Sequence, residues 1–142
     1  MSGQPLQKVN IEDVLGAHPP RTNVNAFWVD GKYTLRVAHV RGEYPWHRHD
    51  DWDEGWFVHR GLVRIRSDAG DVELSAGEAA LIPRGLRHSP LALEDRSTVL
   101  IVNARDFKTT YLEGHDHVAA GYREFDLTAD GAVPTERVEG KQ

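Results

Sequence analysis

Residues 45–54 read PWHRHDDWDE and place two histidines, His47 and His49, one residue apart and just ahead of an acidic cluster. On a helix, side chains two residues apart point about 200° away from each other and cannot bind the same ion. On a strand they project from the same face, roughly 7 Å apart along the backbone, and can converge. The meaning of this stretch therefore depends on the secondary structure around it.

Short apolar runs follow one another at intervals of about 8 to 12 residues through the middle of the chain, which is typical of an antiparallel sandwich or barrel. Glycines and prolines separate the runs as turn residues, and no helical periodicity interrupts them. The predicted strands are YTLRVAHV (33–40), EGWFVHR (54–60), LVRIRS (62–67), DVELS (71–75), AALIP (79–83), RHSPLAL (87–93) and STVLIVN (97–103). The third and fourth, joined by a short turn, predict a hairpin. The predicted fold class is all-β.

The length of 142 residues fits one compact domain. We expect an N-terminal arm or edge strand over residues 1–32, with a helical turn at IEDVLGA (11–17). The central barrel spans 33–103. Residues 104–142 form a C-terminal extension with one further strand at REFDL (123–127) and a mobile end.

Composition excludes several classes of function. The chain has no cysteine, which removes disulfides, thiolate zinc sites and cysteine nucleophiles. A formal charge of −5 argues against nucleic acid as a partner. No apolar run is long enough for a membrane helix, and the N-terminal residues lack a signal-peptide segment, so we expect a cytoplasmic protein without a membrane partner.

Two ordered patterns carry a resemblance to a known family. The first reads GEYPWHRHDDWDEGWFVHRG (42–61) and the second GEAALIPRGLRHSPLA (77–92). Together they resemble the two motifs of the cupin superfamily, and the chain is most similar to the small single-domain cupins called mannose-6-phosphate isomerase-like. The resemblance implies a double-stranded β-helix, or jelly-roll, barrel with one metal ion in its mouth.

The family pattern also implies a ligand set. The positions that bind the metal in cupins correspond to His47, His49, Glu54 and His88. Three imidazoles and one carboxylate suit a divalent ion of iron, manganese, nickel, cobalt or zinc. On zinc, which prefers four ligands, the same set can close the site and make it structural. The second motif departs from the family at Ala92, where cupins often have asparagine.

Strand alternation adds candidates for the walls of a substrate pocket. Trp56 shares the face of Glu54, and apolar or aromatic walls are usual in small-molecule sites. Pro90 and Ala92 follow His88 on its own face, and their small side chains would leave room for a ligand. These three residues are the predicted pocket lining.

Acid–base candidates are few. If the strand at 33–40 alternates from an inward Leu35, then His39 also faces inward and Arg36 faces outward. His39 and Tyr44 are then the candidate catalytic bases, although a lone inward histidine is more often a hydrogen-bonded core residue. A second His-x-His pair, at His115 and His117, lies in a glycine-bounded stretch and is interpreted as surface.

The resulting prediction is a metal-binding cupin that acts on a small, oxygen-rich metabolite. A dioxygenase ranks first, because an iron site with adjacent open positions can bind substrate and dioxygen together. A metal-dependent isomerase, lyase or decarboxylase of a sugar or keto acid is the second interpretation, and a non-catalytic small-molecule-binding cupin is the third. Small cupins commonly pair by strand exchange, so a homodimer is expected.

Overall fold

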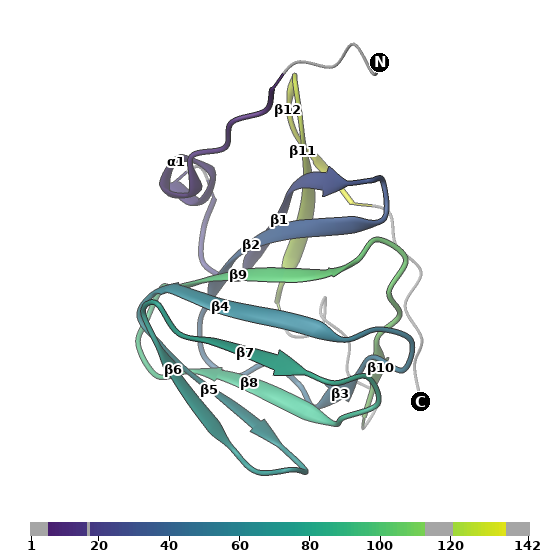
Figure 1. Cartoon of the computed structure of the whole chain (residues 1–142). Helices are drawn as coiled ribbons and strands as arrows, with labels where there is room; N and C mark the ends of the chain where they lie inside the picture. The colour runs from purple at the N-terminus through teal and green to yellow at the C-terminus, as the bar shows by residue number, and fades with distance from the viewer. Residues whose placement is uncertain (1–5, 17, 113–120, 136–142) are drawn as a thin grey trace.

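The computed structural model describes residues 6–16, 18–112 and 121–135 and shows two β-sheets packed face to face (Figure 1). The seven-stranded sheet has the order β12-β11-β1-β2-β9-β4-β7. Its strands are β1 (Thr22–Val29), β2 (Tyr33–Val40), β4 (Glu54–Arg60), β7 (Ala79–Ile82), β9 (Ser97–Ala104), β11 (Arg123–Thr128) and β12 (Gly131–Pro134). The five-stranded sheet has the order β10-β3-β8-β5-β6. Its strands are β3 (His47–Arg48), β5 (Leu62–Ser67), β6 (Val72–Ser75), β8 (His88–Ala92) and β10 (Thr110–Tyr111).

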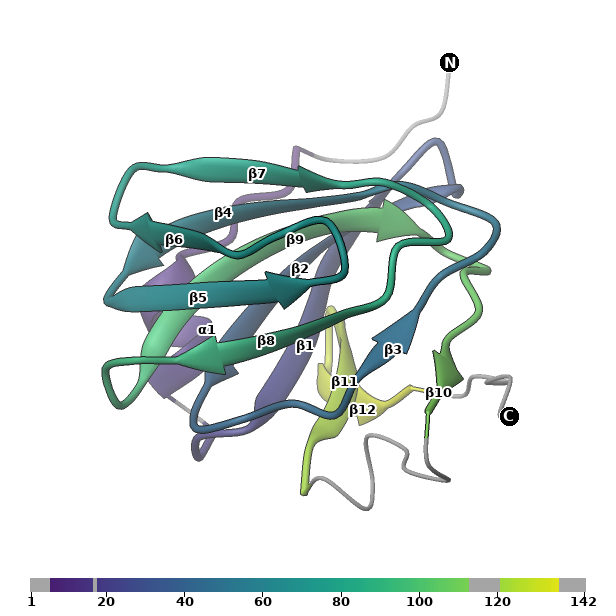
Figure 2. The ribbon, with the colours of Figure 1, turned by 90° about the horizontal axis from the view of Figure 1, so that it is seen from below.

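This architecture is the predicted all-β jelly-roll. The seven apolar runs of the central region coincide with β2, β4, β5, β6, β7, β8 and β9, and β5 and β6 form the predicted antiparallel hairpin. Figure 2 shows the two sheets curving around a shared interior. Buried side chains from both sheets form one hydrophobic cluster there, with Val58 and Val99 from one sheet and Val63 and Ile65 from the other.

The outer face of the larger sheet carries a second, smaller core. The short helix α1 (Ile11–Gly16) lies against it and buries Leu15 together with Val37 and Ala26. The inner and outer faces of β2 are therefore both buried.

No helix in the described ranges is long and apolar enough to cross a membrane.

The N-terminal strand does not lie at the edge of the sheet. β1 pairs with β2 on one side and, in parallel, with β11 on the other. The C-terminal hairpin β11–β12 extends the sheet beyond β1, so β1 is an interior strand. Segments on both sides of the central region thus complete the barrel.

The core valines allow a test of this packing. Val99 is fully buried, whereas Val102, three residues further along β9, is half-exposed on the outer face. We expect Val99→Ala to lower the free energy of unfolding by about 1 to 3 kcal/mol, because it leaves a cavity. Val102→Ala should change it by no more than about 0.5 kcal/mol. Urea unfolding of both variants measures the difference, and equal effects would contradict the assignment of the inner face.

Candidate metal centre

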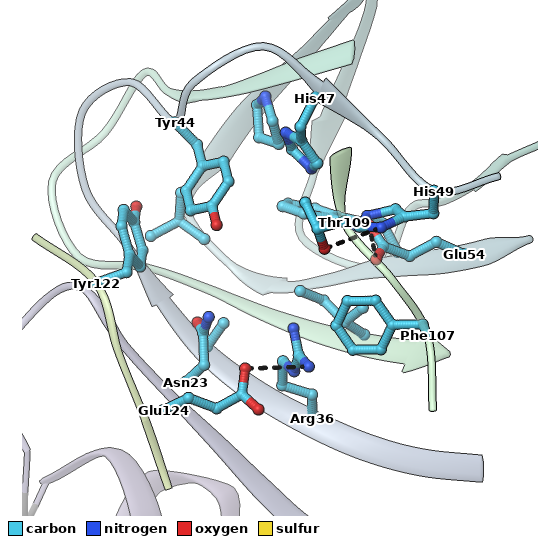
Figure 3. Close-up of a pocket in the computed structure, with 15 residues that line it drawn as sticks. Asn23, Arg36, Tyr44, His47, His49, Glu54, Phe107, Thr109, Tyr122 and Glu124 are labelled. Carbon is cyan, nitrogen blue, oxygen red and sulfur yellow. Dashed lines mark hydrogen bonds and ion pairs between the residues drawn. The ribbon is translucent and has the colours of Figure 1, made fainter. Parts of the chain in front are cut away.

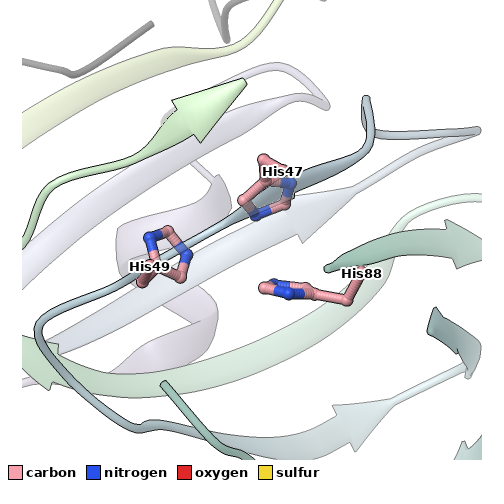
Figure 4. Close-up of side chains that lie close together, drawn as sticks. All are labelled: His47, His49 and His88. Carbon is pink, nitrogen blue, oxygen red and sulfur yellow. The ribbon is translucent and has the colours of Figure 1, made fainter. Parts of the chain in front are cut away.

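Three histidines converge inside the barrel (Figure 4). His47 in β3 is the register partner of His88 at the start of β8, and His49 follows β3 directly. One ring nitrogen from each lies within 4.8 Å of the others. All three side chains are buried, His88 the most completely. The His-x-His pair therefore converges from one extended segment, as a strand permits and a helix does not.

A backbone carbonyl fixes the orientation of each imidazole. Because a carbonyl oxygen only accepts hydrogen bonds, Nδ1 of each ring is the donor, and Nε2 keeps its lone pair when the ring is neutral. The donor–acceptor distances are 2.7 Å from His47 to Pro45, 3.0 Å from His49 to Lys108 and 2.9 Å from His88 to Leu86. A hydrogen bond on the far nitrogen is the usual support of a metal-binding histidine.

The carboxylate of Glu54 lies beside these rings at the start of β4. Its Oε2 is 3.3 Å from Nε2 of His49, and its Oε1 is 4.0 Å from Nε2 of His88. Two further side chains donate hydrogen bonds to it, Trp56 at 2.5 Å and Asn103 at 3.1 Å. Sequence reasoning missed Asn103, although its position two residues after the inward Ile101 marks a polar side chain on the buried face of β9.

One atom of the cluster lacks a hydrogen-bond partner. Nε2 of His88 is buried and makes no hydrogen bond within the described part of the chain. Buried polar atoms are nearly always satisfied, so such an atom needs an explanation. A divalent ion bound by the imidazoles and the carboxylate would provide one, and this donor set suits such an ion.

Burial and mutual contact set the charges of the cluster. Burial, with the neighbouring histidines, holds the pKa of His47 well below its usual range, and burial likewise lowers the pKa of His88. For His49, burial opposes the charge of Glu54 and the carboxylate prevails, raising the pKa. For Glu54, burial is outweighed by His49, so its pKa lies well below the usual value. Glu54 is therefore ionised at neutral pH.

These shifts predict how the metal-free protein responds to acid. His47, His88 and the buried His39 all have lowered pKa values, so below about pH 6.5 the unfolded chain binds more protons at these positions than the folded chain. These three histidines therefore lower the free energy of unfolding as the pH falls below that value. His49, with its raised pKa, acts in the opposite sense but is a single group. We expect urea unfolding in chelator to show lower stability at pH 5.5 than at pH 7.5, and no decrease would contradict the burial of the uncharged rings.

The cluster forms one end of a pocket that encloses about 540 Å³, counted with its open mouth (Figure 3). Of the predicted pocket residues, Trp56 and Pro90 line it, as does Tyr44. The Tyr44 hydroxyl lies 2.5 Å from that of Tyr111. Ala92 is instead partly buried against the hydrophobic cluster between the sheets.

The predicted facing of β2 is wrong. The strand alternates as expected, but Arg36 and Ala38 line the pocket, whereas His39 points to the outer face. There, Nε2 of His39 lies 3.0 Å from the carbonyl of Leu15 in α1. Because α1 covers that face, both sides of the strand are buried, and hydrophobicity alone cannot determine its phase. The alternative interpretation of His39 as a hydrogen-bonded core residue is confirmed.

The C-terminal extension supplies several pocket residues that sequence reasoning did not find. Phe107 and Thr109 come from the segment before β10, and Tyr122 and Glu124 from the β11 region. No motif marks these positions, since the pairing of β10 with β3 and of β11 with β1 brings them to the pocket. The second His-x-His pair, at residues 115–117, lies outside the described residues.

Comparison with known proteins is consistent with this geometry. Residues 33–103, half of the chain, match the family model described as cupin domain. The chain is 33% identical over 82 residues to "Uncharacterized protein YdbB" of Bacillus subtilis (strain 168), which covers 57% of this chain and 72% of the relative.

Solved structures agree on the fold. A cupin-2 domain containing protein from Shewanella frigidimarina NCIMB 400 superposes with a TM-score of 0.64 at 28% identity, over 68% of this chain and 94% of the other. The hydroquinone 1,2-dioxygenase PnpCD, in complex with Cd2+ and 4-hydroxybenzonitrile, gives a TM-score of 0.55 at 24% identity, over 67% and 70%. The similarity to the dioxygenase shows a shared fold only.

Proposed function

Because this chain belongs to the cupin domain family, we propose that it is a metal-dependent enzyme that acts on a small, oxygen-rich molecule. The proposed ligands of its single divalent ion are His47, His49, Glu54 and His88. Among the reactions open to such a site, we place a dioxygenase first.

The observation that carries this proposal is the orientation of the three buried imidazoles. Each has its Nδ1 occupied by a carbonyl, and the three candidate ligand nitrogens lie within 4.8 Å of one another. A buried ring nitrogen without a partner, such as Nε2 of His88, is costly unless a cation binds it. The ionised carboxylate of Glu54 beside them adds the negative charge that a divalent ion favours.

When bound, the ion would supply Lewis-acid or oxygen-activating chemistry. Neighbouring side chains hold the proposed ligands in position and restrict the access of water to them. Trp56 and Asn103 hold the two oxygens of Glu54, and the apolar Val40 and Ile101 line the space next to it. A substrate oxygen placed there would meet a largely apolar, preorganised site.

A scarcity of general bases supports the dioxygenase over acid–base chemistry. Besides Glu54, one other carboxylate lines the pocket among the described residues, that of Glu124. It is ion-paired with Arg36 at 3.2 Å and so is not a free base. Reactions that remove a carbon-bound proton need a free base within reach of the substrate.

One observation favours the second candidate, a metal-dependent isomerase, lyase or decarboxylase. The Tyr44 ring lies 4.9 Å from the ring of His47, and its hydroxyl shares a short hydrogen bond with Tyr111. A phenol pair so close to the ligands can hold or release a proton at the Tyr44 oxygen.

Metal content and oxygen uptake test the proposal together. Untagged protein, purified without chelators, should contain close to one equivalent of iron, manganese, nickel or cobalt. The protein is loaded with Fe2+ under anaerobic conditions. It is then screened against phenols, enols and keto acids in the presence of oxygen, in an oxygen electrode. Substrate-dependent oxygen uptake supports the dioxygenase, and turnover without oxygen supports the isomerase or lyase. Metal binding without any turnover would leave a ligand-binding cupin, and no metal uptake at all would refute the proposed site.

A further inference from the structure

We infer that the end of the pocket opposite the histidines is a carboxylate-binding subsite built on Arg36, so that the substrate is a small organic acid. The inference rests on the proposed function, because it takes the metal centre as the other end of the same pocket. Arg36 lies in β2 and Glu124 in β11, and both line the pocket (Figure 3).

The guanidinium of Arg36 is buried without full hydrogen bonding. Its side chain is 7% exposed. Nη2 faces Oε1 of Glu124 at 3.2 Å but makes no aligned hydrogen bond in the described ranges, and Nε has a single long contact of 3.4 Å to Asn25. A buried arginine has five N–H donors to satisfy, and leaving them unmade is costly. Figure 3 shows the head group of Arg36 pointing toward the interior of the pocket.

A network of side chains fixes this cation before any ligand arrives. The fully buried Asn25 accepts hydrogen bonds from Thr34 at 3.0 Å and from Arg36. Its amide donates to Glu124 at 3.2 Å and to Asp126 at 2.8 Å. The same asparagine therefore holds both members of the ion pair, as expected of a preorganised binding group.

The cation and the metal ligands belong to one continuous wall. The Arg36 guanidinium lies over the ring of Phe107, 4.8 Å from its centroid, and the Phe107 ring meets that of His49 at 5.1 Å. A ligand seated between the two ends would contact the apolar Ala38 and Ile101. The pocket thus fits a molecule with an apolar middle and a polar group at each end.

The charge and shape of the subsite select a carboxylate. Arginine binds planar oxyanions through two parallel hydrogen bonds, a geometry that neutral groups match less well. A divalent ion, Glu54, Arg36 and Glu124 together carry one net positive charge when the histidines are neutral. A monoanionic substrate would neutralise the pocket, which a low-dielectric site favours.

Matched ligands that differ by one charge test the inference. The Mn2+-loaded protein is titrated calorimetrically with 3-hydroxybenzoate and with 3-hydroxybenzamide. We expect the acid to bind at least about 10-fold more tightly than the amide. In Arg36→Met the acid should lose about 10- to 100-fold in affinity, the amide should be unaffected, and the preference should disappear. In Glu124→Gln the preference should persist or grow, because a competing carboxylate is gone.

The control variant is Arg105→Met, which removes another arginine that lies over an aromatic ring, 4.7 Å from the centroid of Trp28. It should leave the preference for acids intact. Metal content is measured in every sample. Wild-type protein that takes up no Mn2+ refutes the proposed function, whereas metal-loaded wild type that binds acids and amides equally overturns the subsite. Equal loss of both ligand types in Arg36→Met would show a purely structural ion pair, and stronger competition by inorganic phosphate than by acetate would reassign the subsite to phosphate esters.

Discussion

Replacing His88 with glutamine should lower the affinity of the protein for Mn2+ by at least about 100-fold. His88 is fully buried, and its unbonded Nε2 faces the other candidate ligands. Loss of a mere supporting hydrogen bond at a metal site costs about 10- to 100-fold, so loss of a ligand should cost at least as much. Glutamine is similar in length and can still donate a hydrogen bond, which limits the disturbance to the barrel. Calorimetric titration of chelator-treated protein measures the affinity.

His59→Gln is the matched control. His59 lies on the outward face of β4 and pairs with Glu12 at 3.0 Å, away from the pocket. Its replacement should leave Mn2+ binding unchanged. Circular dichroism and thermal unfolding establish that both variants fold. A folded His88→Gln protein that binds Mn2+ as tightly as the wild type would exclude His88 from the metal centre.

The sequence was sufficient to predict the fold and to name the side chains that cluster in the barrel. The strands were predictable because period-two alternation and turn glycines are local signals. His47, His49, Glu54 and His88 were identified through two short motifs, and they do lie together. Local signals of this kind survive in a single sequence because they do not depend on distant partners.

The far end of the pocket was not predictable, for two physical reasons. The side of β2 that faces the pocket could not be read from hydrophobicity, because α1 buries the outer face as well. Val37 is buried on the outer face and Ala38 on the inner face, and both are apolar. The placement of Glu124 depends on a parallel pairing between β1 and β11, which are about a hundred residues apart in the chain. Arg36 was therefore expected outside the barrel and lies inside it. The residues that set substrate choice under our proposal are those whose positions depend on long-range contacts.

Replacing Gly61 with alanine should destabilise the fold by about 3 to 5 kcal/mol. Gly61 connects β4 to β5 with a φ of +95°, a backbone conformation that side chains with a Cβ rarely adopt. An added Cβ would also lie 2.8 Å from Cβ and 2.9 Å from Cα of Ser97. Ser97 cannot easily move away, because its buried hydroxyl donates to the carbonyl of Glu94 at 2.7 Å and accepts from the backbone of Leu62 at 3.2 Å.

Gly77→Ala separates the two causes. Gly77 has a similar φ of +88°, but a Cβ there would meet no atom within 4 Å in the described structure. Its replacement should cost only the backbone strain, about 1 to 2 kcal/mol. The difference between the two variants in urea unfolding therefore isolates the collision with Ser97. Equal destabilisation would show that the turn after β4 relaxes around the new methyl group, and that the contact between Gly61 and Ser97 does not constrain the joint between the two sheets.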